Sequence, residues 1–372
     1  MIKVCILTSV HPPFDTRIFH KEAKSLAKAG YDVTLIAQHD KDEIVNGIRI
    51  VPLSKPKNRI GRMTRTVWSV YRKALDLDAG IYHFHDPELI PVGLLLKFHG
   101  KRVIYDVHED YSEAILYKEW LPLQLRKVIA MLSDRIEKTI ARYFSAVITV
   151  TNRIGKRFGL TTNGDVVVVQ NFPILNGMFD EELMMPWNDK GNTAVFVGSI
   201  GAIRGIREMV KALQLIPDEL NIQLLLAGYF SSESLKEEVE CMPGWDRCEY
   251  LGYTQLRNVA KFLGRAKIGL VLTHPVSNLL NGQPVKLYEY MSAGIPVVAS
   301  NFPLWRKVIE ESGCGICVNP LNPEEIATAI IWLLDNQEEA ERMGLRGRRA
   351  VEERYNWCRE EKKLLRLYSE LM

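Results

Sequence analysis

The chain of 372 residues is poor in cysteine, carries little net charge and has no long apolar run. Its six cysteines are scattered, so no disulfide framework is required and a reducing cytoplasm is the simpler expectation. A formal net charge of +3 is too small to indicate nucleic acid as a ligand. No apolar run approaches the roughly 20 residues of a membrane-spanning helix. The N-terminal segment MIKVCILTSV also lacks the small-residue cleavage site of a secretory signal peptide.

Two familiar nucleotide-binding motifs are also missing. The chain has neither a Walker loop nor a G-x-G-x-x-G fingerprint, which disfavours nucleoside triphosphate or NAD binding of the usual kind. What is present is an ordinary globular composition, 47% hydrophobic and 25% charged. A chain of this length suits two domains, each with its own core.

Predicted strands and helices alternate along the chain, which favours an α/β fold. A strand Lys3–Thr8, a helix near Ile18–Ala29 that ends at Gly30, and a strand Asp32–Ala37 form a βαβ unit, whose strands are parallel. Further strands are expected at Ile81–Phe84, Val103–Asp106, Ala146–Val150, Ala194–Gly198, Gln223–Ala227, Glu249–Leu251, Gly269–Leu272, Pro296–Ala299 and Gly315–Val318.

The segment Pro173–Gly191 is rich in proline, glycine, asparagine and acidic residues, and it is expected to be a linker. It would separate an N-terminal domain, residues 1–175, from a C-terminal domain, residues 190–356. Strand–helix alternation on both sides predicts two Rossmann-like, doubly wound domains that face a cleft.

The most informative segment is Gln283–Ser300, QPVKLYEYMSAGIPVVAS. It predicts a helix that begins near Pro284 and ends at Gly294, followed by a buried strand. The free N–H groups and partial positive charge at a helix N-terminus favour an anion such as a diphosphate. Glu289 lies about one and a half turns into the helix, where its carboxylate can accept two hydrogen bonds from a ribose diol. The segment therefore predicts a nucleotide site.

This segment resembles the donor-site helix of the GT-B glycosyltransferases of family 4. Those enzymes carry two glutamates eight residues apart, then a small-residue turn and a G-x-P-V-V-A strand. Glu289 matches the second glutamate, whereas Asn281 stands where the first would be and is expected to contact the sugar hydroxyls instead. The resemblance covers nearly the whole chain. It implies the GT-B architecture, with the C-terminal helix (357–372) crossing back onto the first domain.

The block Val197–Ile206, VGSIGAIRGI, follows a strand and opens a helix, so its backbone can approach a phosphate. In the resembling family this block offers an arginine and then a lysine to the donor diphosphate. Ser199 and Arg204 occupy those positions here, and Lys286 is placed to restore the missing charge. The alternative is that Arg204 is a solvated residue at a helix start. The expected donor-binding set is Gly198, Ser199, Arg204, Tyr253, Asn281, Lys286, Leu287 and Glu289.

The first domain is expected to contribute residues beyond the carboxyl ends of its strands. In the resembling family a histidine at this point lies against the transferred sugar, and His108 matches it. The alternative for His108 is a loop histidine bonded to a backbone carbonyl. Asp106 and Glu109 are weaker candidates, with Glu109 on the acceptor side, because a strand-end acid is often only a cap. The implied catalytic set is His108, Arg204 and Lys286.

The first loop carries Asp15 and Arg17 where many relatives are rich in glycine. An acid and an arginine two residues apart suit recognition of acceptor hydroxyls or an acceptor phosphate. They equally suit an aspartate that caps the next helix, followed by a surface arginine. The sequence leaves these two interpretations open.

His83, His85 and Asp86 have the residue types of metal ligands, and the two histidines would share one face of a strand. The resembling family holds no metal at this turn, so a structural or cleft-lining role is favoured. No metal and no cofactor are expected, since the nucleotide-sugar is a substrate.

Two other groups are assigned no chemistry. Asp76 and Asp78 resemble the acidic pair of metal-dependent glycosyltransferases, but they end a predicted helix rather than a strand and are expected to be solvated. Cys314 and Cys317 form a lone C-x-x-C with no second pair, which is weak as a zinc or redox motif, so both are expected in the core.

One stretch, Lys55–Lys73, carries basic residues and no acid, with apolar residues such as Trp68 and Tyr71 between them. This composition is typical of an interfacial helix on an anionic membrane. The alternative is a helix whose apolar face packs on the sheet; nucleic acid is disfavoured because no motif for it is present. The basic residues are Lys55, Lys57, Arg59, Arg62, Arg65, Arg72 and Lys73.

Together these features predict a metal-independent glycosyltransferase that uses a nucleotide-sugar donor and a glycan or lipid-linked acceptor in surface polysaccharide synthesis. The resemblance implies retention of configuration. The expected location is the cytoplasm or the inner face of the cell membrane. Two alternatives stay open: a non-catalytic partner subunit, motivated by Ser199 and Asn281, and a sugar-nucleotide epimerase or phosphorylase on the same scaffold.

Overall fold

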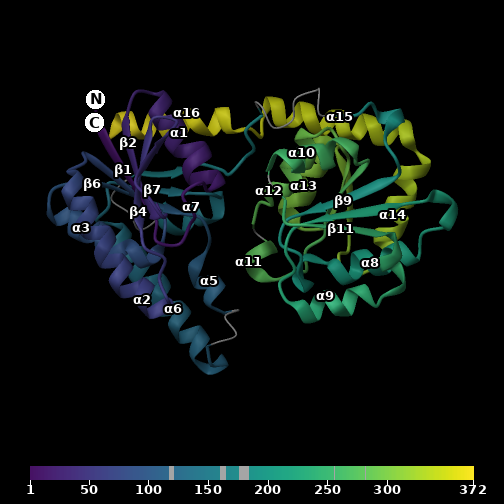
Figure 1. Cartoon of the computed structure of the whole chain (residues 1–372), viewed down its shortest axis with the longest axis horizontal. Coiled ribbons are helices and arrows are strands. Elements are labelled where there is room, and N and C mark those ends of the chain that lie inside the picture. The colour runs from purple at the N-terminus through teal and green to yellow at the C-terminus, as the bar shows by residue number, and fades with distance from the viewer. Residues whose placement is uncertain (117–120, 160–164, 176–183, 255, 281) are drawn as a thin grey trace. The chain divides into compact units, whose positions relative to one another are not determined.

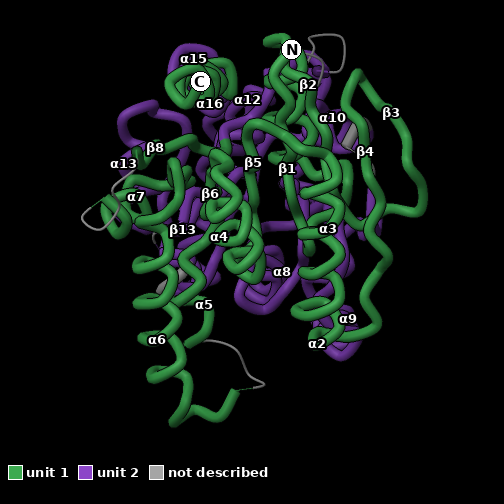
Figure 2. Tube along the Cα trace, turned by 90° about the vertical axis from the view of Figure 1, so that its left-hand side faces the viewer, with its two compact units in different colours: residues 1–171, 357–372 green, residues 172–356 purple. Residues whose placement is uncertain are grey.

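Two β-sheets organise the chain, each in its own compact unit (Figure 2). A computed structural model describes residues 1–116, 121–159, 165–175, 184–254, 256–280 and 282–372. Unit 1 is Met1–Asn171 with Trp357–Met372, and unit 2 is Phe172–Asn356. The expected linker, Pro173–Gly191, thus falls wholly within unit 2.

The sheet of unit 1 has the strand order β3-β4-β2-β1-β5-β6-β7-β8. All neighbouring strands are parallel except β3 and β4, which form an antiparallel hairpin. Asn46 and Gly47 at its turn both have positive φ, 52° and 78°, as a two-residue hairpin turn requires. The strands are β1 (Lys3–Leu7), β2 (Asp32–Gln38), β3 (Glu43–Val45), β4 (Ile48–Leu53), β5 (Ile81–Phe84), β6 (Arg102–Val107), β7 (Ala146–Thr149) and β8 (Asp165–Val168).

Helices cover the sheet of unit 1 and bury its apolar side chains. Phe84 on β5 stacks on Tyr105 on β6, with ring centroids 4.7 Å apart, and both lie in the core. The segments, with η for 3₁₀ and π helices, are η1 (Thr16–Ala23), α1 (Lys24–Lys28), α2 (Arg59–Gly61), η2 (Arg62–Thr66), α3 (Val67–Leu77), η3 (Pro87–Leu89), α4 (Ile90–Phe98), α5 (Tyr111–Leu116), α6 (Leu123–Ala141), α7 (Asn152–Gly159) and α16 (Trp357–Glu370).

The last helix, α16, belongs to unit 1 although it follows unit 2 in the sequence. It packs against η1 and α1 near the chain termini (Figure 1). Trp357 donates from Nε1 to Oγ of Ser25 at 3.0 Å, and the hydroxyl of Tyr368 lies 2.9 Å from Nδ1 of His83. These contacts fix both ends of α16 in unit 1.

The sheet of unit 2 is parallel throughout, in the order β11-β10-β9-β12-β13-β14. Its strands are β9 (Thr193–Val197), β10 (Gln223–Ala227), β11 (Cys248–Gly252), β12 (Ile268–Val271), β13 (Val297–Ser300) and β14 (Gly315–Val318). Its helices are η5 (Trp187–Asp189), η6 (Ala202–Arg204), α8 (Ile206–Gln214), η7 (Asp218–Leu220), α9 (Glu233–Glu240), η8 (Pro243–Arg247), α10 (Leu256–Arg265), α11 (Ser277–Leu280), α12 (Val285–Ser292), α13 (Pro303–Ser312), α14 (Pro323–Asp335) and α15 (Gln337–Glu353).

The helix predicted around Glu289 is α12. Pro284 is its N-cap, and Gly294, with φ of 68°, follows the C-cap Ala293. The first helix of unit 1 begins earlier than expected, at Thr16, because Asp15 caps it. In the part of the chain that the structure describes, no helix is both long and apolar enough to cross a membrane.

Candidate functional site

The predicted phosphate-binding residues of unit 2 meet at a glycine turn after β9. Gly198, with φ of 122°, takes a conformation that side chains rarely adopt. A Cβ placed on Gly198 would lie 2.6 Å from Cε and 2.7 Å from Nζ of Lys286. The ammonium group of Lys286, from α12, is therefore packed against the turn that follows β9.

Lys286 lies in an environment that disfavours its positive charge. Its Nζ is 5.4 Å from the ring centroid of Phe196, and burial together with the charge of Arg204 lowers the pKa of Lys286 to about 8, against the opposing effect of Glu289. Arg204 ends η6, and Gly205 then begins α8 with φ of 74°. Arg204 and Lys286 thus lie within electrostatic reach of one another and of Glu289, and the two positive charges suit a polyanion.

The other donor-site residues take different positions. Glu289 is half-buried on α12, and Ser199 is exposed. The side chain of Leu287 is buried in the core and its N–H donates to the carbonyl of Pro284 at 3.1 Å, so Leu287 holds the helix rather than offering its side chain to a ligand. Asn281 lies outside the described residues.

Two exposed tyrosines form a flat aromatic surface in unit 2. Tyr253 (66% exposed) and Tyr229 (61% exposed) stack with ring centroids 4.8 Å apart and planes 7° apart. Each follows a glycine at the carboxyl end of a strand, Gly228 after β10 and Gly252 at the end of β11. Tyr229 was not predicted from the sequence, although it repeats the glycine–tyrosine pair that marked Tyr253.

In unit 1, His108 directly follows β6 and is partly exposed. Its Nε2 lies 2.9 Å from Nδ1 of His85, and its ring centroid is 5.3 Å from that of His11. The partner of His108 is therefore another imidazole rather than the backbone carbonyl of the alternative interpretation. Glu109, next in the chain, is exposed.

Asp15 and Arg17 have separate roles in the structure. Oδ1 of Asp15 accepts from the backbone N–H groups of Arg17 and Ile18 at 2.8 and 2.9 Å, so Asp15 is the N-cap of η1. Arg17 is only 3% exposed, which contradicts the surface arginine of one interpretation and leaves no exposed guanidinium for the acceptor contact of the other. Its guanidinium donates to Asp106 at 2.8 to 3.2 Å and to the carbonyl of Val169 at 3.0 Å. The buried carboxylate on β6 turns this side chain inward.

Arg17 borders a buried cluster of metal-ligand types: Glu22, His83, His85 and Asp106, whose ligand atoms all lie within 4.8 Å of one another. Burial lowers the pKa of both histidines, whereas Arg17 and His108 keep the pKa of Asp106 well below its usual range despite burial. Glu22 comes from η1 and was not singled out in the sequence, because the strands and the helix that unite the cluster are far apart in the chain.

Asp86 has a structural role at the same edge of the sheet. Its Oδ2 accepts from Oγ1 of Thr8 at 2.8 Å and from the backbone N–H groups of Ser9 and Val10 at 2.6 and 3.2 Å. This carboxylate therefore holds the loop after β1 in place.

The remaining groups agree with their structural interpretations. Asp76 and Asp78 are exposed, and Asp78 pairs with Lys101. Cys314 is buried in the core of unit 2, and Cys317 is half-buried against it; both are free thiols.

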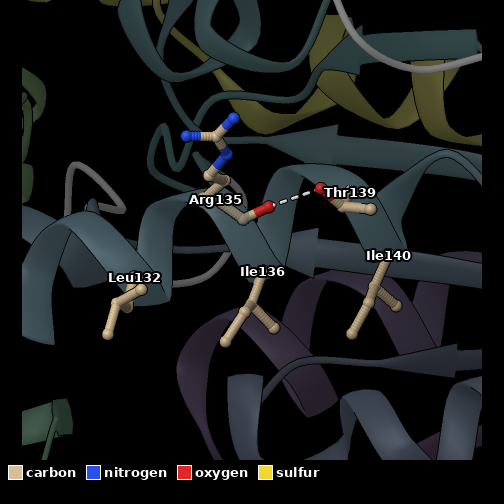
Figure 3. Close-up of a pocket in the computed structure, with 5 residues that line it drawn as sticks. All are labelled: Leu132, Arg135, Ile136, Thr139 and Ile140. Atoms are coloured by element: carbon tan, nitrogen blue, oxygen red, sulfur yellow. Dashed lines mark hydrogen bonds between the residues drawn. The ribbon is translucent and has the colours of Figure 1, made fainter.

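A shallow hollow lies on α6, lined by Leu132, Arg135, Ile136, Thr139 and Ile140 (Figure 3). Oγ1 of Thr139 donates to the carbonyl of Arg135 at 2.7 Å, so the one hydroxyl in the hollow is already bonded. The hollow contains none of the predicted site residues, and it marks an apolar surface instead of a site for chemistry.

Comparisons of the sequence with family models and with known proteins agree with one another. Residues 16–172 match the model of Glycosyltransferase Family 4, and residues 184–350 match that of Glycosyl transferases group 1. Phosphatidyl-myo-inositol mannosyltransferase of Mycolicibacterium smegmatis is 24% identical over 361 residues, covering 93% of this chain and 87% of that protein. O-antigen chain mannosyltransferase B of Escherichia coli is 25% identical over 292 residues, 76% of this chain and 68% of that protein.

Solved structures share the fold at low identity. Sucrose-phosphate synthase from Thermosynechococcus elongatus superposes with a TM-score of 0.77 at 18% identity, covering 100% of this chain and 99% of the other. Anabaena HepE in complex with UDP and glucose gives 0.73 at 15% identity, with both chains covered completely. The two matched regions span both parallel-sheet units, and we conclude that the chain belongs to glycosyltransferase family 4, the group 1 glycosyl transferases, and has the GT-B fold.

Proposed function

We propose that this glycosyltransferase transfers a sugar from a nucleotide-sugar donor, with retention and without a metal ion, to a glycan or lipid-linked acceptor. The observation that carries the proposal is the contact of Lys286 with the Gly198 turn, within the electrostatic reach of Arg204. Two cations at a glycine turn suit a diphosphate, whose departure they stabilise as negative charge develops.

The other donor contacts are assigned to Glu289 and to two tyrosines of unit 2. Glu289 accepts hydrogen bonds from the ribose, and the stacked pair Tyr229 and Tyr253 offers a surface on which the base stacks. Stacking on an aromatic side chain contributes roughly 1–3 kcal/mol per base in other nucleotide-binding proteins. Asn281 reads the sugar hydroxyls in this proposal.

His108 orients the transferred sugar. It is partly exposed and is held by a second side chain, His85. No protein nucleophile takes part; the rate enhancement comes from orientation of the sugar and from stabilisation of the leaving diphosphate.

The acceptor is proposed to be membrane-bound and reached from the cytoplasmic face. Relatives named for phosphatidyl-myo-inositol and for an O-antigen chain support an acceptor of this kind. In α3, Val70 and Ala74 pack into the core, while the outer side of the 55–73 segment exposes apolar side chains between its basic ones: Ile60, Met63 and Trp68. One side of the segment thus packs on the sheet, and the other side suits contact with an anionic lipid surface.

The helix α6 offers a second apolar surface in unit 1. The exposed residues on α6 include Leu123, Leu125, Val128, Met131, Leu132 and Ile136. Single exposed apolar residues are ordinary, but a series along one helix supports contact with a partner or a membrane.

The function is tested by thermal unfolding across a panel of nucleoside diphosphates and nucleotide-sugars, followed by product analysis with the stabilising donor. A ligand at 100 times its dissociation constant adds about 2.7 kcal/mol of stability. Slow hydrolysis or transfer that persists in excess chelator supports the proposal. Donor that is epimerised, donor that stays intact with every acceptor fraction, or turnover restored only by magnesium or manganese would contradict it.

A further inference from the structure

His108 lies at one end of a row of three side chains, His108, His85 and Glu22. The proposed mechanism assigns no role to Glu22. Nε2 of His108 lies 2.9 Å from Nδ1 of His85, which follows the neighbouring strand β5 and is buried. Among the described residues, Nδ1 of His108 has no hydrogen-bond partner, so this is the ring atom available to a ligand. Between two imidazole nitrogens one must donate and the other accept, so the proton of His85 decides the tautomer of His108.

The second nitrogen of His85 faces Glu22 on η1. Nε2 of His85 and Oε2 of Glu22 are 3.6 Å apart, which is longer than a hydrogen bond. Both atoms are buried and have no other hydrogen-bond partner in the described part of the chain. Because unpaired buried polar atoms are unfavourable, a small movement that joins the two is expected.

Arg17 determines which oxygen of Glu22 carries a proton. One guanidinium balances one of the two buried carboxylates, and it donates to both oxygens of Asp106. Burial and the charge of Asp106 raise the pKa of Glu22 well above its usual range, although Arg17 opposes this, so the fold favours the neutral carboxyl. Nε of Arg17 donates to Asp106 but also lies 2.9 Å from Oε1 of Glu22, so its positive charge disfavours a proton on that oxygen. A proton on Oε2, the oxygen nearer His85, is therefore favoured, although Asp106 also acts on this carboxyl.

We propose that Glu22 acts through His85 to hold His108 in one tautomer. Oε2–H of Glu22 donates to Nε2 of His85, Nδ1–H of His85 donates to Nε2 of His108, and His108 keeps its own proton on Nδ1. His108 then presents a hydrogen-bond donor to a hydroxyl oxygen of the sugar. The identity of that ligand rests on the proposed function, whereas the row of three side chains does not. Glu22 and His85 are positioning residues.

Other charged and titratable groups face the row without replacing its members. Oδ2 of Asp106 is 3.6 Å from Nδ1 of His85 and from Nε2 of His108, but it already accepts from Arg17. His83, beside His85, is bonded through Nδ1 to the hydroxyl of Tyr368 on α16.

On the exposed side, the ring of His11 lies tilted beside that of His108, with the two planes 58° apart. Burial opposes protonation of His11, but its hydrogen bond to Asp15 and the charge of Asp86 raise its pKa above the ordinary value.

The charge balance of the row argues against a metal ion at the same residues. Arg17 pairs with Asp106, and burial favours the neutral forms of Glu22, His83 and His85. A divalent cation would have to displace the guanidinium from the carboxylates it already holds. Metal binding is therefore an outcome of the test that would overturn the proposal.

The test compares Glu22→Gln with Glu22→Met. Glutamine keeps a carbonyl beside Arg17 and an N–H donor toward His85, whereas methionine removes the donor. Nuclear magnetic resonance of ¹⁵N-histidine-labelled protein reads the tautomer of His108. We expect an Nδ1–H tautomer in the wild type and in E22Q, and a mixture or the Nε2–H form in E22M, with kcat reduced about tenfold and donor KM little changed.

The pH profile of kcat/KM provides a second measurement, which a change in folding stability alone does not alter. Ionised Glu22 accepts from His85 and reverses the row, so the wild type loses activity as pH rises through the pKa of Glu22. E22Q lacks this alkaline limb. The matched control is Glu137→Gln, a buried carboxylate of unit 1 that accepts from Tyr105 and pairs with Arg157; it is expected to lower stability and leave the His108 tautomer unchanged.

The outcomes separate this inference from the proposed function. An unchanged tautomer in E22M, an alkaline limb that persists in E22Q, or Zn²⁺ that stabilises the wild type but not His85→Gln would each overturn the row. A tautomer that changes as expected without any effect on turnover supports the row and contradicts the sugar contact of His108. If E22M does not fold, the pH profile of E22Q still decides.

Discussion

The burial of Lys286 and the positive charge of Arg204 near it are the clearest indication of an anion-binding site. A pKa of about 8 means that Lys286 is largely protonated at neutral pH but loses its proton more readily than an exposed lysine. A bound diphosphate favours the charged form. We predict that affinity for the nucleoside diphosphate falls as pH rises from 7 to 9.5, measured by titration calorimetry. Lys286→Arg, whose charge does not titrate in this range, is expected to bind with little pH dependence; an equally pH-dependent variant would contradict the assignment.

The same pKa makes a prediction for the ligand-free protein. The folded-state pKa lies below the unfolded value of 10.5, so the fold favours the neutral amine. This buried charge destabilises the protein below about pH 8, and the penalty fades as pH rises from 8 toward 10.5. Lys286→Met should raise the melting temperature at pH 7 more than at pH 10. Equal shifts at both pH values would show that the ammonium is not desolvated.

Substitution of the two cations gives a direct measure of their contribution. We expect Arg204→Ala and Lys286→Ala each to weaken donor binding by roughly 1.5–3 kcal/mol, as for lost hydrogen bonds to a charged group. Arg207→Ala is the matched control, because Arg207 lies on the same helix start but pairs with Glu238 on the surface. Wild-type affinity in both single variants would show that neither cation contacts the donor.

At the scale of single residues, the sequence predicted those that belong to a recognisable local motif. Lys286 and Gly198 stand in such motifs, and the structure brings them into contact. The prediction for Arg17 was wrong in two respects, since Arg17 lies in η1 instead of a loop and is buried. Its burial depends on Asp106, 89 residues away in the chain. Glu22 was missed for the same reason, since only the folded sheet places it beside two histidines.

Among the elements, η1 shows how one cap controls a segment of the site. Asp15 caps η1, and hydrogen bonds from His11 and from backbone N–H groups lower the pKa of Asp15 to about 2, although burial acts in the opposite direction. Loss of such a cap costs about 1 kcal/mol. We predict this destabilisation for Asp15→Ala at pH 7, measured by urea unfolding.

The pH dependence distinguishes the cap from a simple packing role. Because the folded pKa of Asp15 is below the unfolded value of 3.8, its stabilisation is complete above pH 3.8 and is lost as pH falls toward 2. Asp15→Asn keeps a capping oxygen, so its free energy of unfolding at pH 7 should lie closer to that of the wild type than the value for Asp15→Ala. Because asparagine does not titrate, Asp15→Asn should lose less stability in acid than the wild type. If Asp15→Asn and Asp15→Ala were equally destabilised at pH 7, the cap would not be the cause.

Element prediction succeeded where apolar runs and glycine stops coincide. β5, β10 and β14 fall on the expected residues, and α12 ends before Gly294 as predicted. The hairpin β3–β4 was missed although Asn46-Gly47 is a strong turn signal, because β3 has only 3 residues and lies at the edge of the sheet. The π-helical start of η1 has no sequence signature of its own, since it depends on the packing of Arg17 and Glu22 beneath it.

For the whole molecule, the basic segment 55–73 predicts attachment to anionic lipid. Arg62 pairs with Glu88 and is better left unchanged, so the variant reverses three exposed residues, Lys57, Arg65 and Arg72, to glutamate. We expect the wild type to sediment with anionic vesicles at low salt and to be released by salt, because exposed charges are screened over about 8–10 Å at physiological ionic strength. The variant should stay in solution with unchanged donor affinity.

A control with the same change in net charge reverses three exposed residues of unit 2: Lys261, Arg265 and Arg349. This control should still bind anionic vesicles. Release of both variants to the same extent would indicate a general charge effect. Equal sedimentation of the wild type with neutral and anionic vesicles would indicate that the 55–73 segment serves packing only.

The central claim is that unit 2 recognises a diphosphate through Arg204 and Lys286. Titration calorimetry with the nucleoside monophosphate and diphosphate of the preferred base measures the contribution of the second phosphate directly. We predict that the wild type binds the diphosphate at least tenfold more tightly and that this difference disappears in the Arg204→Ala/Lys286→Ala double variant. Equal affinity for the two nucleotides in the wild type, or a difference that survives in the double variant, would contradict the claim.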